Sequence, residues 1–460
     1  MSLKLYNTLT RGVNEFVPIK QGEVGIYVCG ATVQGSPHIG HLRSGVVFDV
    51  LRRWMQDSGL KVTLVRNVTD IDDKILHNAH HEDMPWWALA YKYEQEFTKA
   101  HEALGNLAPT VEPRATGHIP QMIELIQKLI EKNYAYESQG TVWFSVRAFN
   151  EYGKLSGQDI EQMLAAEDKD QGKKDPHDFA LWKAAKTDEP HWNTPWGPGR
   201  PGWHIECSAM AHAYLGEEFD IHGGGIDLQF PHHENEIAQS NAAGHKFARR
   251  WMHNAWVTQA GEKMSKSLGN STKISEVLKI VEPIHLRYYL ISGHYRSNLE
   301  YSENSLKEAG LSFSRIEKFL QNAPKAEPSK VTEDFANAMN EDLNTPKAIA
   351  VIHETVTQGN QALAKQDLEK ARDLAGSLRK MLDVLGLDPA AANWSKATSN
   401  NQAQSSLEVL IEGMLKMRDE ARANKNFALS DQVRDDLKRA NISIEDTVNG
   451  SRWSFKSEDD

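Results

Sequence analysis

Two cysteines, a histidine and a glutamate form a candidate metal site. The chain contains two cysteines, Cys29 and Cys207, and a Pro-His-His-Glu-Asn-Glu segment over 231–236. If a helix follows the proline, His232 and Glu236 lie on one of its faces, because they are four residues apart. Two thiolates, an imidazole and a carboxylate suit a tetrahedral zinc site. The sulfur ligands favour zinc over magnesium or calcium.

Spacing does not single out one ligand set. His233 and Glu234 are alternative ligands from the same segment. Two buried cysteines that bind nothing are the alternative to any metal site, because free cysteines are often buried and inert. A structural disulfide between them is not expected in a reducing compartment.

A second group of residues is typical of phosphate chemistry. His38-Ile39-Gly40-His41 directly follows a proline and begins a predicted helix. A helix N-terminus offers free N–H groups and a positive dipole to phosphate. The imidazoles of His38 and His41 add donors that can follow charge in a transition state. Gly40 has no Cβ, so a base can approach the backbone there. Two helix-surface histidines without a role are the alternative.

A lysine-rich loop is the third candidate. Lys263-Met264-Ser265-Lys266-Ser267 follows the last predicted strand and lies between Gly261 and Gly269. Lys263 and Lys266 on such a loop can close over a triphosphate and neutralise charge as pyrophosphate leaves. A solvated lysine loop is the alternative. The two motifs, one in each half of a predicted sheet, together indicate nucleotide activation.

The elements that must position these residues have the pattern of a parallel sheet. A strand over Gly25–Cys29, a helix from His38 to about Gly59 and a strand over Val62–Val68 form a βαβ unit. Ligands of such sheets gather at the carboxyl ends of the strands. Cys29 and Thr69 both lie at such ends.

The rest of the chain predicts an insertion and then helices. The sheet pattern is interrupted from about 120 to 200 and returns at Phe219–Ile221 and Trp251–Thr258. Amphipathic helices follow residue 305, and an Ala/Ser/Asn/Gln-rich linker is predicted over 388–406. The net charge of −11 gives no uniform basic footprint, although a local patch can still hold RNA. The sequence shows no signal peptide and no stretch of the roughly 20 apolar residues that a membrane span needs, so we expect a cytoplasmic protein.

These motifs resemble the bacterial cysteinyl-tRNA synthetases, which are class I aminoacyl-tRNA synthetases. The resemblance extends over nearly the whole chain and rests on segments in the family's order: Tyr27–Gly30, His38–His41, Asn67–Lys74, Gly199–Cys207, His222–Asp227, Pro231–Glu236 and Lys263–Ser267. It implies ATP-dependent activation of L-cysteine, with magnesium, and transfer to cysteine tRNA by a monomeric enzyme.

The resemblance also implies a fold. We expect an α/β protein with a Rossmann-like class I catalytic domain over 1–120 and 200–257, split by an inserted acceptor-end subdomain over 121–199. A loop with the lysine motif and a connecting fold over 258–305 follows. The chain then continues as an α-helical bundle over 306–387, the linker over 388–406 and a small anticodon-binding module over 407–460.

Roles for individual residues follow from the same resemblance. It selects Cys29, Cys207, His232 and Glu236 as ligands of one zinc per chain. His38, His41, Lys263 and Lys266 are implied to be catalytic, and ATP is implied to contact Gly40, His41, Gly225, Asp227 and Lys266. The implied cysteine-binding residues are Cys29, Gly30, Thr69 and Trp203, with Thr69 bonding the ammonium or the carboxylate. Ordinary packing is the alternative for Thr69 and Trp203. The implied tRNA-binding residues are Arg422, Phe427, Asp431 and Trp453, for which a solvated helix face is the alternative.

The implied zinc would bind the thiol of the substrate. A thiol loses its proton readily on a metal, with a free pKa of about 8.5, whereas the alcohol of serine does not. A separate editing domain is therefore not expected.

Three other functions are alternatives to this one. A cysteine ligase of mycothiol biosynthesis activates cysteine similarly but transfers it to an amino sugar, and the module after residue 406 argues against it. A zinc hydrolase is disfavoured because its His-Glu-x-x-His pattern is missing. A catalytically dead RNA-binding adaptor is disfavoured by the intact histidine and lysine motifs.

Overall fold

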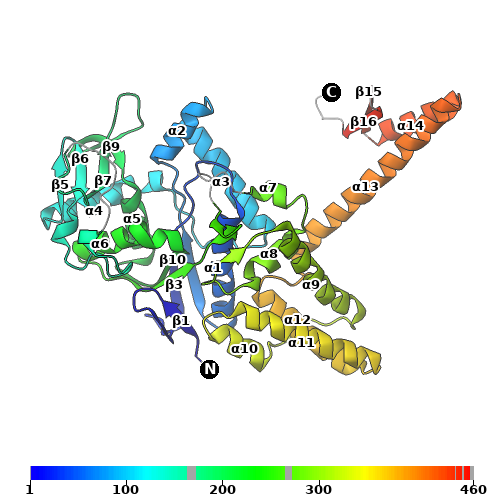
Figure 1. Ribbon diagram of the computed structural model, residues 1–460, viewed down its shortest axis with the longest axis horizontal. Helices are drawn as coiled ribbons and strands as arrows, with labels where there is room; N and C mark the ends of the chain where they lie inside the picture. The colour runs from blue at the N-terminus through cyan, green and yellow to red at the C-terminus, as the bar shows by residue number, and fades with distance from the viewer. Residues whose placement is uncertain (1, 163–171, 265–271, 441, 448–449, 456–460) are drawn as a thin grey trace. The chain divides into compact units, whose positions relative to one another are not determined.

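The computed structural model describes residues 2–162, 172–264, 272–440, 442–447 and 450–455. These residues divide into two compact units, Met1–Asp388 and Pro389–Asp460 (Figure 1). None of the described helices combines the length and the apolar content that a membrane crossing requires.

A parallel four-stranded sheet forms the centre of the first unit. Its strands lie in the order β11 (Phe247–Asn254), β10 (Glu218–Gly225), β3 (Glu23–Val28) and β4 (Lys61–Arg66). All three pairings are parallel. The chain runs from β3 to β4 on one side and from β10 to β11 on the other, so the direction of winding reverses between β3 and β10. The predicted Rossmann-like sheet is confirmed, and its switch point lies where ligands bind in such folds.

Helix α1 (Ile39–Asp57) connects β3 with β4 and begins where the sequence predicts. His38 is its N-cap residue. Its buried face repeats at helical spacing through Leu42, Val46, Val50 and Trp54. That face anchors the helix on the sheet, so the N-terminus of α1 is held at the carboxyl end of β3.

The chain between β4 and β10 forms an inserted layer that packs against the central sheet. Its elements are α2 (Asp73–His81), α3 (Trp86–Ala103), the 3₁₀ turn η1 (Ala115–His118), α4 (Ile119–Glu131), β5 (Ala135–Ser138), β6 (Thr141–Phe144), the 3₁₀ turns η2 (Val146–Ala148) and η3 (Ile160–Gln162), β7 (Phe179–Ala184), β8 (Trp192–Thr194), β9 (Gly197–Pro201) and α5 (Trp203–Leu215). The five strands make an antiparallel sheet in the order β5-β6-β7-β9-β8.

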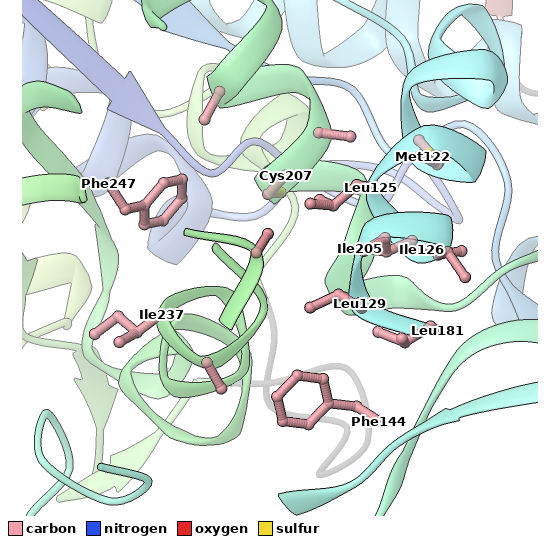
Figure 2. Packing of buried hydrophobic residues seen from close by; sticks show 14 of the residues in the cluster. Met122, Leu125, Ile126, Leu129, Phe144, Leu181, Ile205, Cys207, Ile237 and Phe247 are labelled. Atoms are coloured by element: carbon pink, nitrogen blue, oxygen red, sulfur yellow. The ribbon is translucent and has the colours of Figure 1, made fainter. Parts of the chain in front are cut away.

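The inserted layer shares a core with the central sheet. The apolar face of α4, with Met122, Leu125, Ile126 and Leu129, lies in one cluster with Ile205 of α5 (Figure 2). These side chains are buried. Because α5 also carries Cys207, this packing holds one candidate metal ligand in place.

The remaining elements of the first unit are short strands and helices. A hairpin of β1 (Lys4–Asn7) and β2 (Gly12–Glu15) precedes β3. After β11 come β12 (Val257–Gln259), β13 (Glu262–Lys263), α7 (Ile274–Val277), α8 (Pro283–Ser292), β14 (Leu299–Glu300), α9 (Glu303–Asn322), α10 (Glu333–Asn340), α11 (Thr345–Ala364) and α12 (Leu368–Val384). The helices α9 to α12 lie where the sequence predicts amphipathic helices.

One buried arginine joins the helices to the sheet domain. Arg287 of α8 is fully buried. It donates to Asp49 Oδ2 of α1 at 2.5 Å and to the carbonyls of Leu104 and Leu385. An arginine with these partners fixes α8 and the end of α12 against α1.

The second unit contains α13 (Ala392–Ala423), α14 (Phe427–Arg439) and a hairpin of β15 (Ile442–Thr447) and β16 (Gly450–Phe455). Its core consists of Ile411, Leu415, Val433, Leu437 and Ile442. The predicted linker over 388–406 begins at the boundary between the two units and is helical from Ala392 onward. Alanine and glutamine favour a helix, and residues 392–406 contain neither glycine nor proline.

Candidate metal and nucleotide site

A cavity of about 500 Å³ lies at the carboxyl ends of the parallel strands, at the switch point between β3 and β10. Almost every residue that the sequence assigns to the reaction lines this cavity. Those that line it are Cys29, Gly30, His38, Gly40, His41, Thr69, Trp203, Cys207, Gly225, Asp227, His232 and Lys263. Glu236 lies behind this wall and is fully buried. Lys266 lies outside the described residues.

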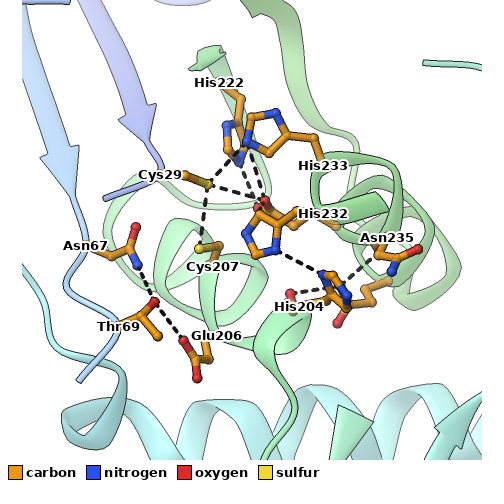
Figure 3. Close-up of polar contacts among 12 residues, drawn as sticks. Cys29, Asn67, Thr69, His204, Glu206, Cys207, His222, His232, His233 and Asn235 are labelled. Carbon is orange, nitrogen blue, oxygen red and sulfur yellow. Dashed lines mark hydrogen bonds and ion pairs between the residues drawn. The ribbon is translucent and has the colours of Figure 1, made fainter. Parts of the chain in front are cut away.

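The four candidate metal ligands converge from different elements, and Figure 3 shows Cys29, Cys207 and His232 among them. Cys29 directly follows β3, Cys207 lies in α5, His232 lies in the π turn η5 (Gln229–His233), and Glu236 lies in the first turn of α6 (Glu234–Ala243). Cys29 Sγ is 3.7 Å from Cys207 Sγ and 3.4 Å from Glu236 Oε1. His232 Nε2 is 3.2 Å from Glu236 Oε1.

These separations fit a tetrahedral zinc ion. With the usual bond lengths, a zinc tetrahedron has edges of about 3.8 Å between sulfurs, about 3.6 Å between sulfur and oxygen, and about 3.4 Å between nitrogen and oxygen. The observed distances of 3.7, 3.4 and 3.2 Å lie within 0.2 Å of these edges. All four ligand atoms lie within 4.8 Å of one another. The residues present therefore fit the metal that the resemblance implies.

A second group of possible ligands overlaps the first. Cys29, His222, His233 and Glu236 also lie within 4.8 Å of one another. His233 Nε2 is 3.3 Å from Cys29 Sγ, and His222 Nε2 is 2.7 Å from Glu236 Oε2. His222 of β10 has no ligand role in the sequence analysis. The chemistry favours the first group, since two thiolates bind zinc better than one.

The competing ligand Glu234 has other partners. Its Oε1 accepts from the backbone N–H of Gly153 at 3.0 Å, and its Oε2 accepts from that of Ser156 at 2.8 Å. Both carboxylate oxygens therefore bind the inserted layer instead of facing the cysteines.

Burial shifts the pKa of every candidate ligand in the direction that favours the neutral form of the side chain. It raises the pKa of Cys29 and Glu236 well above their usual values and also raises the pKa of Cys207. It lowers the pKa of His232 well below its usual value. Charge is costly in so dry a place. A bound divalent cation would offset that cost and hold the thiols and the carboxyl deprotonated.

The imidazole of His232 is oriented by two neighbours. Its Nδ1 lies 3.0 Å from Nδ1 of His204, which leaves Nε2 directed at Glu236. Trp203 stacks on the ring, with centroids 4.3 Å apart. Such second-layer contacts are common around metal ligands. Trp203 thus lies beside the ligand set and lines the cavity.

The nucleotide motif occupies the N-terminus of α1. The rings of His38 and His41 lie 3.7 Å apart, and the His38 backbone N–H donates to His41 Nδ1 at 3.3 Å. A Cβ on Gly40 would lie 3.0 Å from the His38 ring, so a larger residue at this position would crowd that imidazole. These features provide backbone N–H groups and two imidazoles at one end of the cavity.

On the opposite wall, a lysine and an aspartate are paired. Lys263 Nζ lies 3.1 Å from Asp227 Oδ2 of the short turn η4 (Ile226–Leu228), directly after Gly225. Lys263 also lies 5.3 Å from the centroid of Trp256. The residue expected to contact ribose and one of the expected catalytic lysines therefore meet at the cavity.

The candidate tRNA residues lie in the second unit. Arg422 is in the last turn of α13, and Phe427, the first residue of α14, is 64% exposed. Asp431 is exposed on α14. Trp453 instead packs against the core of the unit. Packing thus accounts for part of the surface of this tryptophan.

Two family models match the chain. Residues 15–310 match the catalytic domain of the class I (C) tRNA synthetases. Residues 334–388, which include α10 to α12, match the DALR domain.

Similar curated proteins cover the chain almost completely. The cysteine–tRNA ligase of Streptomyces avermitilis is 52% identical over 99% of this chain and 99% of its own length. The cysteine–tRNA ligase of Cutibacterium acnes is 52% identical over 99% of this chain and 97% of its own. That of Streptomyces coelicolor is also 52% identical, over 99% of this chain and 76% of its own.

Solved structures agree on the fold. The Mycobacterium tuberculosis methionyl-tRNA synthetase in complex with methionyl-adenylate has a TM-score of 0.55 at 15% identity and covers 79% of this chain and 90% of its own. A second structure of that synthetase bound by methionyl-adenylate has a TM-score of 0.56. At this identity the likeness concerns the arrangement of the chain only.

Proposed function

The chain belongs to the cysteine–tRNA ligase family, and we propose that it activates L-cysteine with ATP and transfers it to the 3′-terminal adenosine of cysteine tRNA. The observation that carries the proposal is the joint position of a two-thiolate ligand set and the nucleotide motif on one cavity. The end of the cavity with the ligand set suits a thiol, and the end with the nucleotide motif suits a triphosphate.

In this proposal Cys29, Cys207, His232 and Glu236 hold one zinc ion. When bound, zinc supplies a Lewis acid that selects sulfur over oxygen, because a thiol deprotonates on it far more readily than an alcohol does. Gly30, Thr69 and Trp203 surround the amino acid, and His204 keeps His232 in the ligating orientation through the 3.0 Å contact between their Nδ1 atoms.

The nucleotide half of the cavity acts by positioning and charge. The N-terminus of α1 with His38, Gly40 and His41 receives the phosphates, and Gly225 and Asp227 receive the adenosine. Lys263 exchanges its Asp227 partner for phosphate oxygens, and Lys266 neutralises the departing pyrophosphate. Magnesium accompanies ATP. These groups stabilise charge that grows as the carboxylate of cysteine attacks the α-phosphate.

The second unit is proposed to contact the anticodon through Arg422, Phe427 and Asp431. Exposed Phe427 offers a stacking surface for an unpaired base. The inserted layer over 121–199 is proposed to receive the acceptor end. Transfer of cysteine to an amino sugar is not favoured, because the matching curated proteins are cysteine–tRNA ligases along the entire chain.

The proposal includes the state and place of the enzyme. The cavity and the ligand set come from one chain, so we expect a monomer, which sedimentation of the purified protein would test. Aminoacylation belongs to protein synthesis, so the cytoplasm is the proposed compartment.

The deciding experiment is ATP–pyrophosphate exchange with cysteine and with serine, with and without a zinc chelator. We expect exchange with cysteine alone, and its loss on chelation. Equal exchange with serine, or full exchange by metal-free enzyme, would contradict the zinc-based selection. Formation of cysteinylated amino sugar instead of cysteinylated tRNA would contradict the acceptor.

A further inference from the structure

A chain of hydrogen bonds runs behind the amino-acid end of the cavity. The backbone N–H of Gly30 donates to Asn67 Oδ1 at 2.8 Å, and Asn67 Nδ2 donates to Thr69 Oγ1 at 3.3 Å. Thr69 Oγ1 in turn donates to Glu206 Oε2 at 3.0 Å. Figure 3 shows Asn67, Thr69 and Glu206 in this order beside Cys207.

The direction of these bonds is set from one end. A backbone N–H can only donate, so Asn67 must turn its oxygen toward Gly30. The amide nitrogen of Asn67, which can only donate, then faces Thr69. The hydroxyl of Thr69 therefore accepts on that side, and its single proton remains for Glu206.

Glu206 completes the chain from outside the cavity. It is fully buried and lies in the first turn of α5, next to Cys207 in sequence. Asn67 and Thr69 line the cavity, and Glu206 is absent from that lining. Its Oε1 has no hydrogen-bond partner among the residues that the structure describes. The carboxylate form of Glu206 can only accept from Thr69, and the neutral acid accepts likewise when its proton is on Oε1, the oxygen that has no partner among the described residues.

Once both bonds are made, Thr69 has one lone pair left. A hydroxyl carries one proton and two lone pairs. Glu206 takes the proton and Asn67 takes one lone pair, so a ligand in the cavity meets only an acceptor. A carboxylate has no proton to donate to it, whereas an ammonium group has three.

We propose that Asn67 and Glu206 are positioning residues that fix Thr69 as an acceptor for the α-ammonium group of cysteine. The inference rests on the proposed function and decides between the two groups, ammonium and carboxylate, that Thr69 was expected to bind. Neither positioning residue touches the substrate in this account. Both act through the hydroxyl of Thr69.

The test compares ligands that share the thiol and differ at the other end. Cysteine has both charged groups, cysteamine lacks the carboxylate, and 3-mercaptopropionate lacks the ammonium. Zinc-loaded Glu206→Met keeps the length of the side chain and removes the acceptor. We expect the KM for cysteine and the inhibition constant of cysteamine to rise about 10- to 100-fold, as for loss of a hydrogen bond to a charged group. The inhibition constant of 3-mercaptopropionate and the KM for ATP should change less than about twofold.

Two further variants separate this role from simple support of the fold. Glu206→Gln retains an acceptor oxygen and should recover most of the affinity for cysteine. Thr69→Val should reproduce the defect of Glu206→Met, and the double variant should be no worse than Thr69→Val alone, because both changes remove one interaction. If Glu206→Met does not fold, the effect of Thr69→Val on the affinities for the three thiols still tests the inference.

Several outcomes would overturn the inference. One is an equal loss of affinity for 3-mercaptopropionate and cysteamine, and another is an unchanged KM for cysteine in Glu206→Met and Thr69→Val. A zinc content below one per chain in Glu206→Met, with all thiols weakened together, would assign Glu206 to support of the metal site. Failure of the proposed function is a different result, because the unmodified enzyme would then show no cysteine-dependent exchange.

Discussion

Replacement of Cys207 by serine tests the metal assignment most directly. The two overlapping ligand groups share Cys29 and Glu236, whereas Cys207 and His232 belong only to the first and His222 and His233 only to the second. Cys207→Ser removes a thiolate from the first group and leaves the second intact. His233→Asn does the reverse and serves as the matched variant.

The size of the effect follows from the ligand set. Zinc binding to four protein ligands is worth about 10–16 kcal/mol, so one ligand contributes about 2.5–4 kcal/mol. Loss of one thiolate should therefore weaken zinc about 100- to 1,000-fold. A serine hydroxyl does not replace the thiolate, because the alcohol keeps its proton. The C–O bond of serine is also shorter than the C–S bond of cysteine, so the oxygen would lie farther from Cys29 Sγ than the 3.7 Å that separates the two sulfurs.

The assay is zinc titration against a competing chelator, combined with metal analysis and pyrophosphate exchange. We expect Cys207→Ser to lose zinc and cysteine activation together and His233→Asn to retain zinc. Full zinc in Cys207→Ser and loss of zinc in His233→Asn would move the metal to the second group. Full zinc in both variants would refute both assignments.

Three other predictions concern the lysine loop, the second unit and acid stability. Lys266→Ala should lower the rate of activation about 100- to 1,000-fold with little change in ATP affinity, as removal of a contact made in the transition state does; a single-turnover defect confined to ATP affinity would contradict it. Truncation after Asp388, which preserves the 2.9 Å pair between Arg379 and Asp388, should leave pyrophosphate exchange near normal and raise the KM for tRNA, whereas an unchanged KM would remove the anticodon role. Burial, with His212 and Lys128 nearby, lowers the pKa of His245 to about 4. The unfolded chain therefore binds the extra proton first, and stability should fall as the pH drops from about 6.5 toward 4; His245→Gln should flatten part of this slope in urea titrations, and an unaltered slope would disprove the contribution.

The sequence predicted the sheet because its strands and helices give local signals, and most of the candidate site residues line one cavity at its strand ends. Gly25–Cys29 and Val62–Val68 are apolar runs bounded by turns, and the strands β3 and β4 nearly coincide with these runs. His232 and Glu236 were expected on one helix. The structure instead has the π turn η5 followed by α6, and the two side chains still approach to 3.2 Å.

Long-range partners could not be read from the sequence in the same way. Glu206 lies 137 positions from Thr69 in the chain, and His222 lies 14 positions from Glu236. Both residues belong to segments that carry the family resemblance, yet only the packing of α5 and β10 around the cavity gives them these partners. The predicted linker illustrates a different difficulty. Its Ala/Ser/Asn/Gln-rich composition suits a helix as well as a loop, and the structure has the helix α13 there.

Recognition of cysteine by this cavity requires two different filters. A metal that selects sulfur cannot distinguish cysteine from other small thiols, because every thiolate is a good ligand. The acceptor chain through Asn67, Thr69 and Glu206 cannot distinguish cysteine from serine, because both carry the same ammonium group. The metal distinguishes thiols from alcohols, and the acceptor chain distinguishes ligands with an ammonium group from ligands without one. The two are joined in one helix, since Glu206 and Cys207 are consecutive residues of α5. A shift of that helix would therefore loosen both filters together, so we expect the core that Ile205 shares with α4 to contribute to substrate selection as well as to stability.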